Sequence, residues 1–169
     1  ISFLSAIHKE GHALGSPDNW TPELKFAMSY ILSSVQPALL LWGDSNIVFY
    51  NEAFNDSVDS TLILGESVNT TGILYETIAT SLEELYITGT GISEPEVFIP
   101  NIENGILTDA WWSLNYIPIF NTNGQVSGVS ITFNNISATI KVVNSLKKEN
   151  ANMRLMALQA PVAICVFGN

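Results

Sequence analysis

The chain has 169 residues, which is enough for one domain with attached segments and too few for two complete domains. Its hydrophobic content of 47% excludes a disordered chain, and because no apolar run reaches the roughly 18–20 residues that cross a bilayer, we expect no direct membrane insertion. The net charge of −10 argues against binding to nucleic acid or to an anionic membrane surface.

The first twenty residues form a lead-in in which glycines and a proline interrupt any long helix. A helix is predicted to follow, because Thr21 is a favourable N-cap residue and Pro22 suits the first helical position. Apolar residues then recur at helical spacing, and the helix is expected to end before Pro37.

Two short apolar runs, residues 37–42 and 47–50, flank a Gly-Asp-Ser-Asn turn and predict a pair of strands. Residues 51–58 predict a short helix. Residues 59–72 are rich in Gly, Ser and Thr and predict loops. Residues 73–88 predict the longest helix of the domain, because apolar side chains recur there on one face.

Three further strands are predicted at residues 94–102, 109–120 and 125–133. Pro95 and Pro100 would place the first of them at an edge of the sheet, because proline cannot donate a hydrogen bond to a neighbouring strand. A tight turn ending in Asn-Gly is predicted to join the other two as a hairpin.

From residue 136 onward the spacing changes to the alternating threes and fours of an a/d heptad pattern. We expect the seam of a homodimer here, and its predicted residues are Ile136, Val143, Leu146, Asn150 and Met153. Asn150 would occupy an a position, where a buried polar residue favours a parallel pair in fixed register. A single amphipathic helix that folds back on its own sheet is the alternative that the pattern leaves open.

Residues 159–169 return to strand character and repeat the order Gln, Pro, apolar run and Gly that residues 36–43 show. We expect them to begin a second copy of the same domain. The predicted organisation is therefore a lead-in at 1–20, a domain at 21–136, a helix at 137–158 and the start of another domain at 159–169, all within a longer protein.

Residues suited to catalysis or metal binding are scarce. His8 and His12 do not form the His-Glu-x-x-His zinc motif, and no third ligand is evident. Cys165 is the single cysteine, which excludes a disulfide within the chain and fits a reducing compartment. We therefore expect no metal site and no catalytic activity, with a small α+β enzyme as an alternative.

Aromatic residues in the strands and the long helix are predicted to line a small ligand cavity. The predicted lining residues are Trp42, Phe49, Tyr75, Trp112, Leu114, Tyr116 and Ile131. Tyr75, Trp112 and Tyr116 are the stronger candidates, because each carries a hydrogen-bond donor on an apolar body. The alternative is that the same residues form a packed core.

Several short motifs accompany this order of elements: Leu14-Gly15, Trp20-Thr21-Pro22-Glu23-Leu24, Trp42-Gly43, Tyr50-Asn51-Glu52-Ala53-Phe54, Tyr116-Ile117-Pro118-Ile119 and Gly124-Gln125-Val126-Ser127-Gly128-Val129. With the element order they resemble the N-terminal PAS sensory domain of bacterial sensor histidine kinases. The resemblance covers about residues 11–158, and residues 159–169 resemble the opening of a following PAS domain.

The resemblance implies an α+β fold with a five-stranded antiparallel sheet, short helices on one face, an N-terminal helix and a C-terminal signalling helix. It implies a cytoplasmic sensory module of a two-component system. Such a module detects a small ligand or partner and relays it through the C-terminal helix to kinase domains further along the same protein. A ligand-free dimerisation scaffold is the alternative within the same fold.

The resemblance also bears on cofactors. The flavin-binding branch carries an Asn-Cys-Arg-Phe motif for a covalent flavin bond, and this sequence has no such motif. The haem-binding branch uses a histidine on the long helix, and residues 73–88 contain none. Haem and covalent flavin are therefore disfavoured, which leaves a small organic ligand or no ligand.

Overall fold

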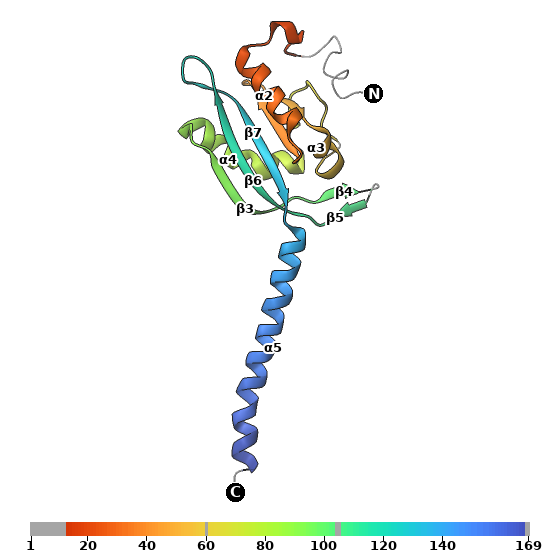
Figure 1. Ribbon diagram of the computed structural model, residues 1–169, viewed down its shortest axis with the longest axis vertical. Coiled ribbons are helices and arrows are strands. Elements are labelled where there is room, and N and C mark those ends of the chain that lie inside the picture. The colour runs from red at the N-terminus through yellow and green to blue at the C-terminus, as the bar shows by residue number, and fades with distance from the viewer. Residues whose placement is uncertain (1–12, 60, 104–105, 168–169) are drawn as a thin grey trace. The chain divides into compact units, whose positions relative to one another are not determined.

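The computed structural model describes residues 13–59, 61–103 and 106–167, with the side chains of these ranges except 102–103 and 159–167 (Figure 1). The chain divides between Asn135 and Ile136 into two units. The first unit holds a turn of 3-10 helix at Pro17–Asn19, α2 (Pro22–Ser33), β1 (Ala38–Trp42), β2 (Ile47–Tyr50), α3 (Glu52–Ser57), α4 (Ile73–Thr88), β3 (Ile92–Phe98), β4 (Asn101–Glu103), β5 (Ile106–Thr108), β6 (Trp111–Phe120) and β7 (Val126–Asn135). The second holds α5 (Ser137–Phe167).

Five antiparallel strands form the main sheet in the order β2-β1-β7-β6-β3, which confirms the fold class predicted from the sequence. β7 lies at the centre, paired with β1 on one side and β6 on the other. β3 lies at an edge, as the prolines of the predicted strand indicated. β4 and β5 form a separate two-stranded sheet.

The single strand predicted at residues 94–102 is wrong in its extent. The structure divides it into β3 and β4, and the register of β3 against β6 shifts between Glu94 and Val97. Pro95 lies within that shift and has no N–H to donate to β6, so the regular ladder is interrupted there. Pro100 separates the two strands for the same reason.

The helices of the first unit begin and end where the local sequence predicts. The Thr21 hydroxyl accepts a hydrogen bond from the backbone N–H of Leu24 at 3.3 Å, and Pro22 occupies the first helical position of α2. α4 spans the predicted residues 73–88 and ends at Gly89, whose φ of 64° is left-handed. Glycine adopts that conformation without the strain that a Cβ would bring.

Asn51 joins three elements through one buried amide. Its side-chain oxygen accepts hydrogen bonds from the backbone N–H groups of Ala38 and Phe54, both at 3.0 Å, so it caps α3 and holds the start of β1. Its Nδ2 donates to three backbone carbonyls, at distances between 2.8 and 3.2 Å, and these belong to Ile31, Ser34 and Gln36. The end of α2 is therefore tied to both β1 and α3.

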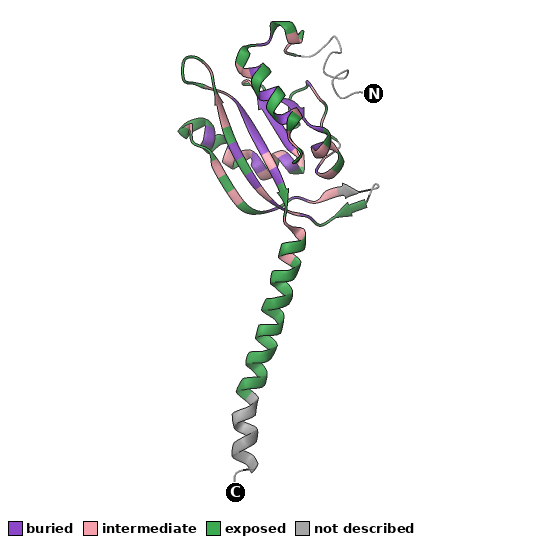
Figure 2. Ribbon diagram, in the orientation of Figure 1, coloured by how far each residue is buried: buried purple, intermediate pink, exposed green. Residues whose placement is uncertain are grey.

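The sheet separates two apolar cores, because successive side chains of a strand point to opposite faces. On one face, Leu40 and Phe49 pack with α2 residues that include Ile31. On the other face, Leu39 and Val48 pack with residues of α3 and α4. Figure 2 shows the buried residues concentrated on the strands between these helices. The N-terminal helix therefore covers the face that α3 and α4 leave open.

In the second unit α5 is one continuous helix to Phe167, so the strand predicted to begin at residue 159 is wrong for residues 159–167. A strand needs a neighbouring strand to satisfy its backbone groups, whereas a helix satisfies them internally. Whether another domain begins in this region stays a prediction. The described helix side chains from 141 to 158 are exposed in the single chain, including Val143, Leu146 and Met153.

Candidate functional site

The seven residues predicted to line one cavity lie on two faces of the sheet. Trp42 and Phe49 belong to the core under α2. Trp112, Leu114, Tyr116 and Ile131 belong to the core under α3 and α4, and Tyr75 packs against its margin. The prediction that all seven share one cavity is therefore wrong. The alternation of residues along a strand shows which of them lie on the same face of that strand. It does not show which faces of two strands distant in sequence lie on the same side of the sheet.

Trp112 is held as a core residue. Its indole N–H donates a hydrogen bond to the carbonyl of Ile99 at 3.0 Å, and its ring meets that of Phe133 edge-on with 6.1 Å between centroids. Leu114 and Ile131 beside it are fully buried. The indole N–H, which the sequence predicted to contact a ligand, thus donates its hydrogen bond to a backbone carbonyl of the protein instead.

Tyr116 carries a buried hydroxyl that lies beside the Ser81 and Glu94 side chains, but no described residue meets it in regular hydrogen-bonding geometry. It lies in the same core as α4, near a pair formed by the Ser81 hydroxyl, which donates to the Glu94 carboxylate. Burial raises the pKa of Tyr116 well above 10.0, and the negative charge of Glu94 raises it further. Glu94 lies two residues from the half-buried Ile92 on β3, so both side chains are on one face of the strand.

We expect Tyr116→Phe to leave the free energy of unfolding unchanged at neutral pH, or to raise it by up to about 1 kcal/mol, because a buried unpaired hydroxyl brings only desolvation. In the wild type the unfolded state loses the phenolic proton first, so stability falls as pH rises above the unfolded pKa of about 10. The variant should lose less stability at alkaline pH. Urea titrations at neutral and alkaline pH measure both effects.

Tyr30→Phe is the matched control, because Tyr30 is exposed. This variant should lose as much stability at alkaline pH as the wild type does. A decrease of more than about 1 kcal/mol for Tyr116→Phe at neutral pH would show instead that the hydroxyl is hydrogen-bonded.

A cavity of about 210 Å³ lies beside Tyr75, between β2, the loops after α3 and the start of α4. Its lining residues are Val48, Asp59, Thr61, Leu62, Ile63, Glu66, Ser67, Asn69, Gly72, Leu74 and Tyr75. Of the predicted ligand residues it contains Tyr75 alone. Apart from Val48 in β2 and Leu74 in α4, the others lie in loops, where no periodicity marks them and only their turn-forming composition is visible, so the sequence interpretation missed them.

Hydrogen bonds hold the loops of this cavity in place. The Tyr50 hydroxyl donates to the carbonyl of Leu62 at 2.9 Å, and the Asp59 carboxylate accepts from the N–H and the hydroxyl of Thr61 at 2.7 and 2.6 Å. Burial raises the pKa of Tyr50, and the nearby charge of Asp59 raises it further. The phenol therefore stays a hydrogen-bond donor at neutral pH.

Among the described residues, no group of three or more His, Cys, Asp or Glu side chains is arranged to hold a metal ion. His8 and His12 lie outside the described residues, as does the side chain of Cys165. None of the described helices has the length and apolarity needed to span a bilayer.

No protein-family model matches the chain, and no curated protein does. Solved structures do match. An RNA-binding Light-Oxygen-Voltage receptor matches with a TM-score of 0.53 and 11% identity, over 87% of this chain and 43% of that one. A phage VqmA–DPO complex gives 0.52 and 13% over 75% of this chain and 58% of that one. The PAS domain of the fruit-fly ELK potassium channel gives 0.49 and 13%, covering 68% and 97%.

The chain has a fold of the PAS and Light-Oxygen-Voltage type. The first two of these structures are longer than the chain, which spans 43% and 58% of their lengths. In this PAS-like domain the cavity beside Tyr75 lies on the face of the sheet that α3 and α4 cover.

Proposed function

We propose that this chain is a non-catalytic sensory module of a bacterial two-component sensor histidine kinase, located in the cytoplasm. A small ligand or partner alters the PAS-like domain, and α5 relays the change to kinase domains in the same protein. The observation that carries this proposal is the junction after β7. This strand is central in the sheet, and along the chain only Ile136 separates its last residue from the first residue of α5.

The cavity beside Tyr75 is our candidate for the ligand site. It offers two carboxylates, Asp59 and Glu66, together with hydroxyl and amide groups. Its volume of about 210 Å³ is below the range of drug-sized pockets, so it suits a small polar molecule. We propose a small organic ligand of this kind, rather than haem or covalent flavin.

The second candidate function is a ligand-free dimerisation scaffold, and the packing of Trp112 and Phe133 favours it. Native mass spectrometry of the purified chain distinguishes the two. A bound mass that disappears in Ser67→Phe, which fills the cavity, supports the sensor. A dimer with no bound mass, in extracts and after incubation with small-molecule libraries, supports the scaffold.

Pairing with a second copy through α5 is part of the proposal. The a and d side chains Val143, Leu146 and Met153 are 39%, 59% and 67% exposed in the single chain, and burial in a seam would remove that apolar area from water. In this register Glu149 is at g and Arg154 at the following e. These positions meet between chains only in a parallel pair, where the two charges attract.

Single cysteines introduced at 143 and 146 should crosslink between chains under mild oxidation, because a–a′ and d–d′ pairs face each other in a parallel seam. The background is Cys165→Ser, which removes the native thiol. Non-reducing electrophoresis measures the crosslinked fraction.

Ser145→Cys is the matched control, because position c of the same turn faces away from the seam. It should crosslink far less than Val143→Cys or Leu146→Cys. Equal crosslinking at all three positions, or none at 143 and 146, would contradict the parallel seam.

A further inference from the structure

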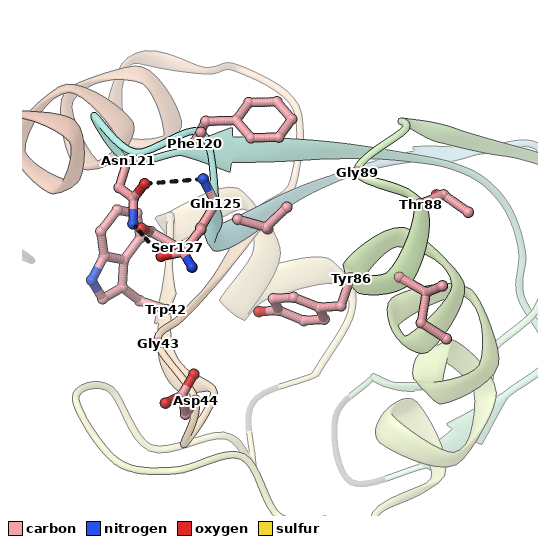
Figure 3. A pocket seen from close by; sticks show the side chains of 13 residues that line it. Trp42, Gly43, Asp44, Tyr86, Thr88, Gly89, Phe120, Asn121, Gln125 and Ser127 are labelled. Atoms are coloured by element: carbon pink, nitrogen blue, oxygen red, sulfur yellow. Dashed lines mark hydrogen bonds between the residues drawn. The ribbon is translucent and has the colours of Figure 1, made fainter.

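A second hollow lies where the β1–β2 turn, the end of α4 and the β6–β7 hairpin meet, and Figure 3 shows the side chains around it. It is an open groove of about 850 Å³. Each of the three elements contributes an aromatic residue to the lining: Tyr86, Phe120, and Trp42, whose side chain packs in the core under α2. Tyr86 and Phe120 are 36% and 45% exposed, whereas Trp42 is almost wholly buried. Aromatic surface is therefore available to a ligand from solvent.

The walls of this groove are held by hydrogen bonds within the protein. The Asn121 side-chain oxygen accepts from the N–H of Gln125 at 3.0 Å, which closes the hairpin (Figure 3). The N–H of Gly43 donates to the carbonyl of Ser127 at 2.8 Å and so ties the β1–β2 turn to β7. A ligand would thus meet a largely preformed site and lose little binding energy in ordering it.

The electrostatic character of the groove is negative. Asp44 is an exposed carboxylate on its lining, and no Lys, Arg or His lines it among the described residues. The 16-residue helix α4 ends at Gly89, so its C-terminal partial negative charge lies at the same place. Asp44 and Tyr86 line the same groove, and burial first, and then the charge of Asp44, raise the pKa of Tyr86.

The net charge of residues 13–135 of the first unit is also negative. All but two of the sixteen Asp and Glu residues lie between 13 and 135, with only one of the six Lys and Arg residues, Lys25. The resulting field attracts cations toward the domain and repels anions.

We propose that this groove binds a small organic ammonium ion. Aromatic faces attract a cation through their quadrupoles, and a quaternary or tertiary amine also gains from apolar contact with the rings. Asp44 and the end of α4 add charge attraction that a neutral molecule of the same shape would not gain. The site is separate from the cavity beside Tyr75 and does not depend on the proposed function.

The test compares choline with its neutral isostere, in which carbon replaces nitrogen, by NMR titration of the whole chain at constant ionic strength. We expect choline to shift the indole N–H resonance of Trp42 and the amide resonances of Tyr86 and Gln125. The isostere should bind roughly three- to thirtyfold more weakly, which is the range that a cation over an aromatic face gives.

Three variants assign the contributions. Tyr86→Leu should weaken choline binding roughly threefold or more, and Tyr86→Phe should retain it, because the ring and not the hydroxyl attracts the cation. Asp44→Asn should weaken choline binding and leave the isostere unaffected. Asp109→Asn, which removes an exposed carboxylate elsewhere, should change neither.

Equal binding of choline and the isostere would overturn the proposal, as would the absence of any shift at the groove. Shifts confined to residues around Tyr75 would also overturn it, and they would place the ammonium ion in the other cavity. That outcome leaves the proposed sensory function standing, so the failures of the two proposals are distinguishable.

Discussion

Replacing Asn51 with alanine should lower the free energy of unfolding by about 3–5 kcal/mol, which is the range for breaking a buried polar network. The amide is 3% exposed and takes part in five hydrogen bonds. Its loss removes one hydrogen bond from each of three carbonyls and two N–H groups, and the carbonyls of Ile31 and Gln36 keep a second donor, from Ser34. The end of α2, the start of β1 and the first turn of α3 would be affected together. Urea unfolding followed by tryptophan fluorescence measures the change.

Asn55→Ala is the matched control on the same helix. The Asn55 amide makes only a 3.4 Å hydrogen bond to its neighbour Asp56, so we expect a change within about 0.5 kcal/mol. Asn51→Asp keeps the accepting oxygen but turns a second oxygen toward the three carbonyls. At neutral pH it should destabilise at least as much as the alanine variant. If Asn51→Asp were as stable as the wild type, the three donated hydrogen bonds would contribute nothing.

Gly128→Ala should lower the free energy of unfolding by about 2–4 kcal/mol through overpacking. Gly128 pairs with Trp42 between β7 and β1, and a Cβ built on it would overlap the indole ring. The same Cβ would lie 2.9 Å from the carbonyl oxygen of Leu41, which is backbone and cannot move aside. The variant must therefore displace a nearly buried tryptophan. Unfolding by urea and the near-ultraviolet circular dichroism of the indole report both effects.

A double-mutant cycle with Trp42→Leu separates the effect of the overlap with the indole ring from that of the close contact with the Leu41 carbonyl. Without the indole ring, Gly128→Ala should destabilise less, because only the contact with the Leu41 carbonyl remains. Strictly additive free energies would show that the indole ring does not cause the destabilisation.

The local elements of this protein could be predicted because their signals are local. Thr21 and Pro22 mark the start of α2 by capping chemistry, and Gly89 ends α4 at a left-handed position. Residue types at fixed offsets determine such features, whatever the rest of the chain does. The extent of the strand at 94–102 and the strand character of residues 159–167 were predicted wrongly for a related reason. The pattern of a strand does not show which partner it will pair with.

The candidate sites depended on tertiary structure. The sequence predicted that Trp42, Phe49, Trp112 and Tyr116 line a ligand cavity or, as the alternative, form a packed core, and all four are buried. It could not show that the first two lie on the opposite face from the others, because relative facing is set by how β1, β2, β6 and β7 assemble. The cavity beside Tyr75 and the groove beside Tyr86 likewise join loops and turns that are distant in sequence.

The sequence by itself thus determined the order of helices and strands, the caps and turns between them, and a fold class that the strand order confirms. The order of elements, the caps and the turns follow from the preferences of neighbouring residues, whereas the fold class was implied by the resemblance of the motifs to those of PAS domains. Only the tertiary structure decided which buried polar groups find partners: Asn51 makes five hydrogen bonds, and the Tyr116 hydroxyl makes none of regular geometry within the described part of the chain. Hydrogen bonding and cavity shape depend on distances between segments that meet only when the chain is folded.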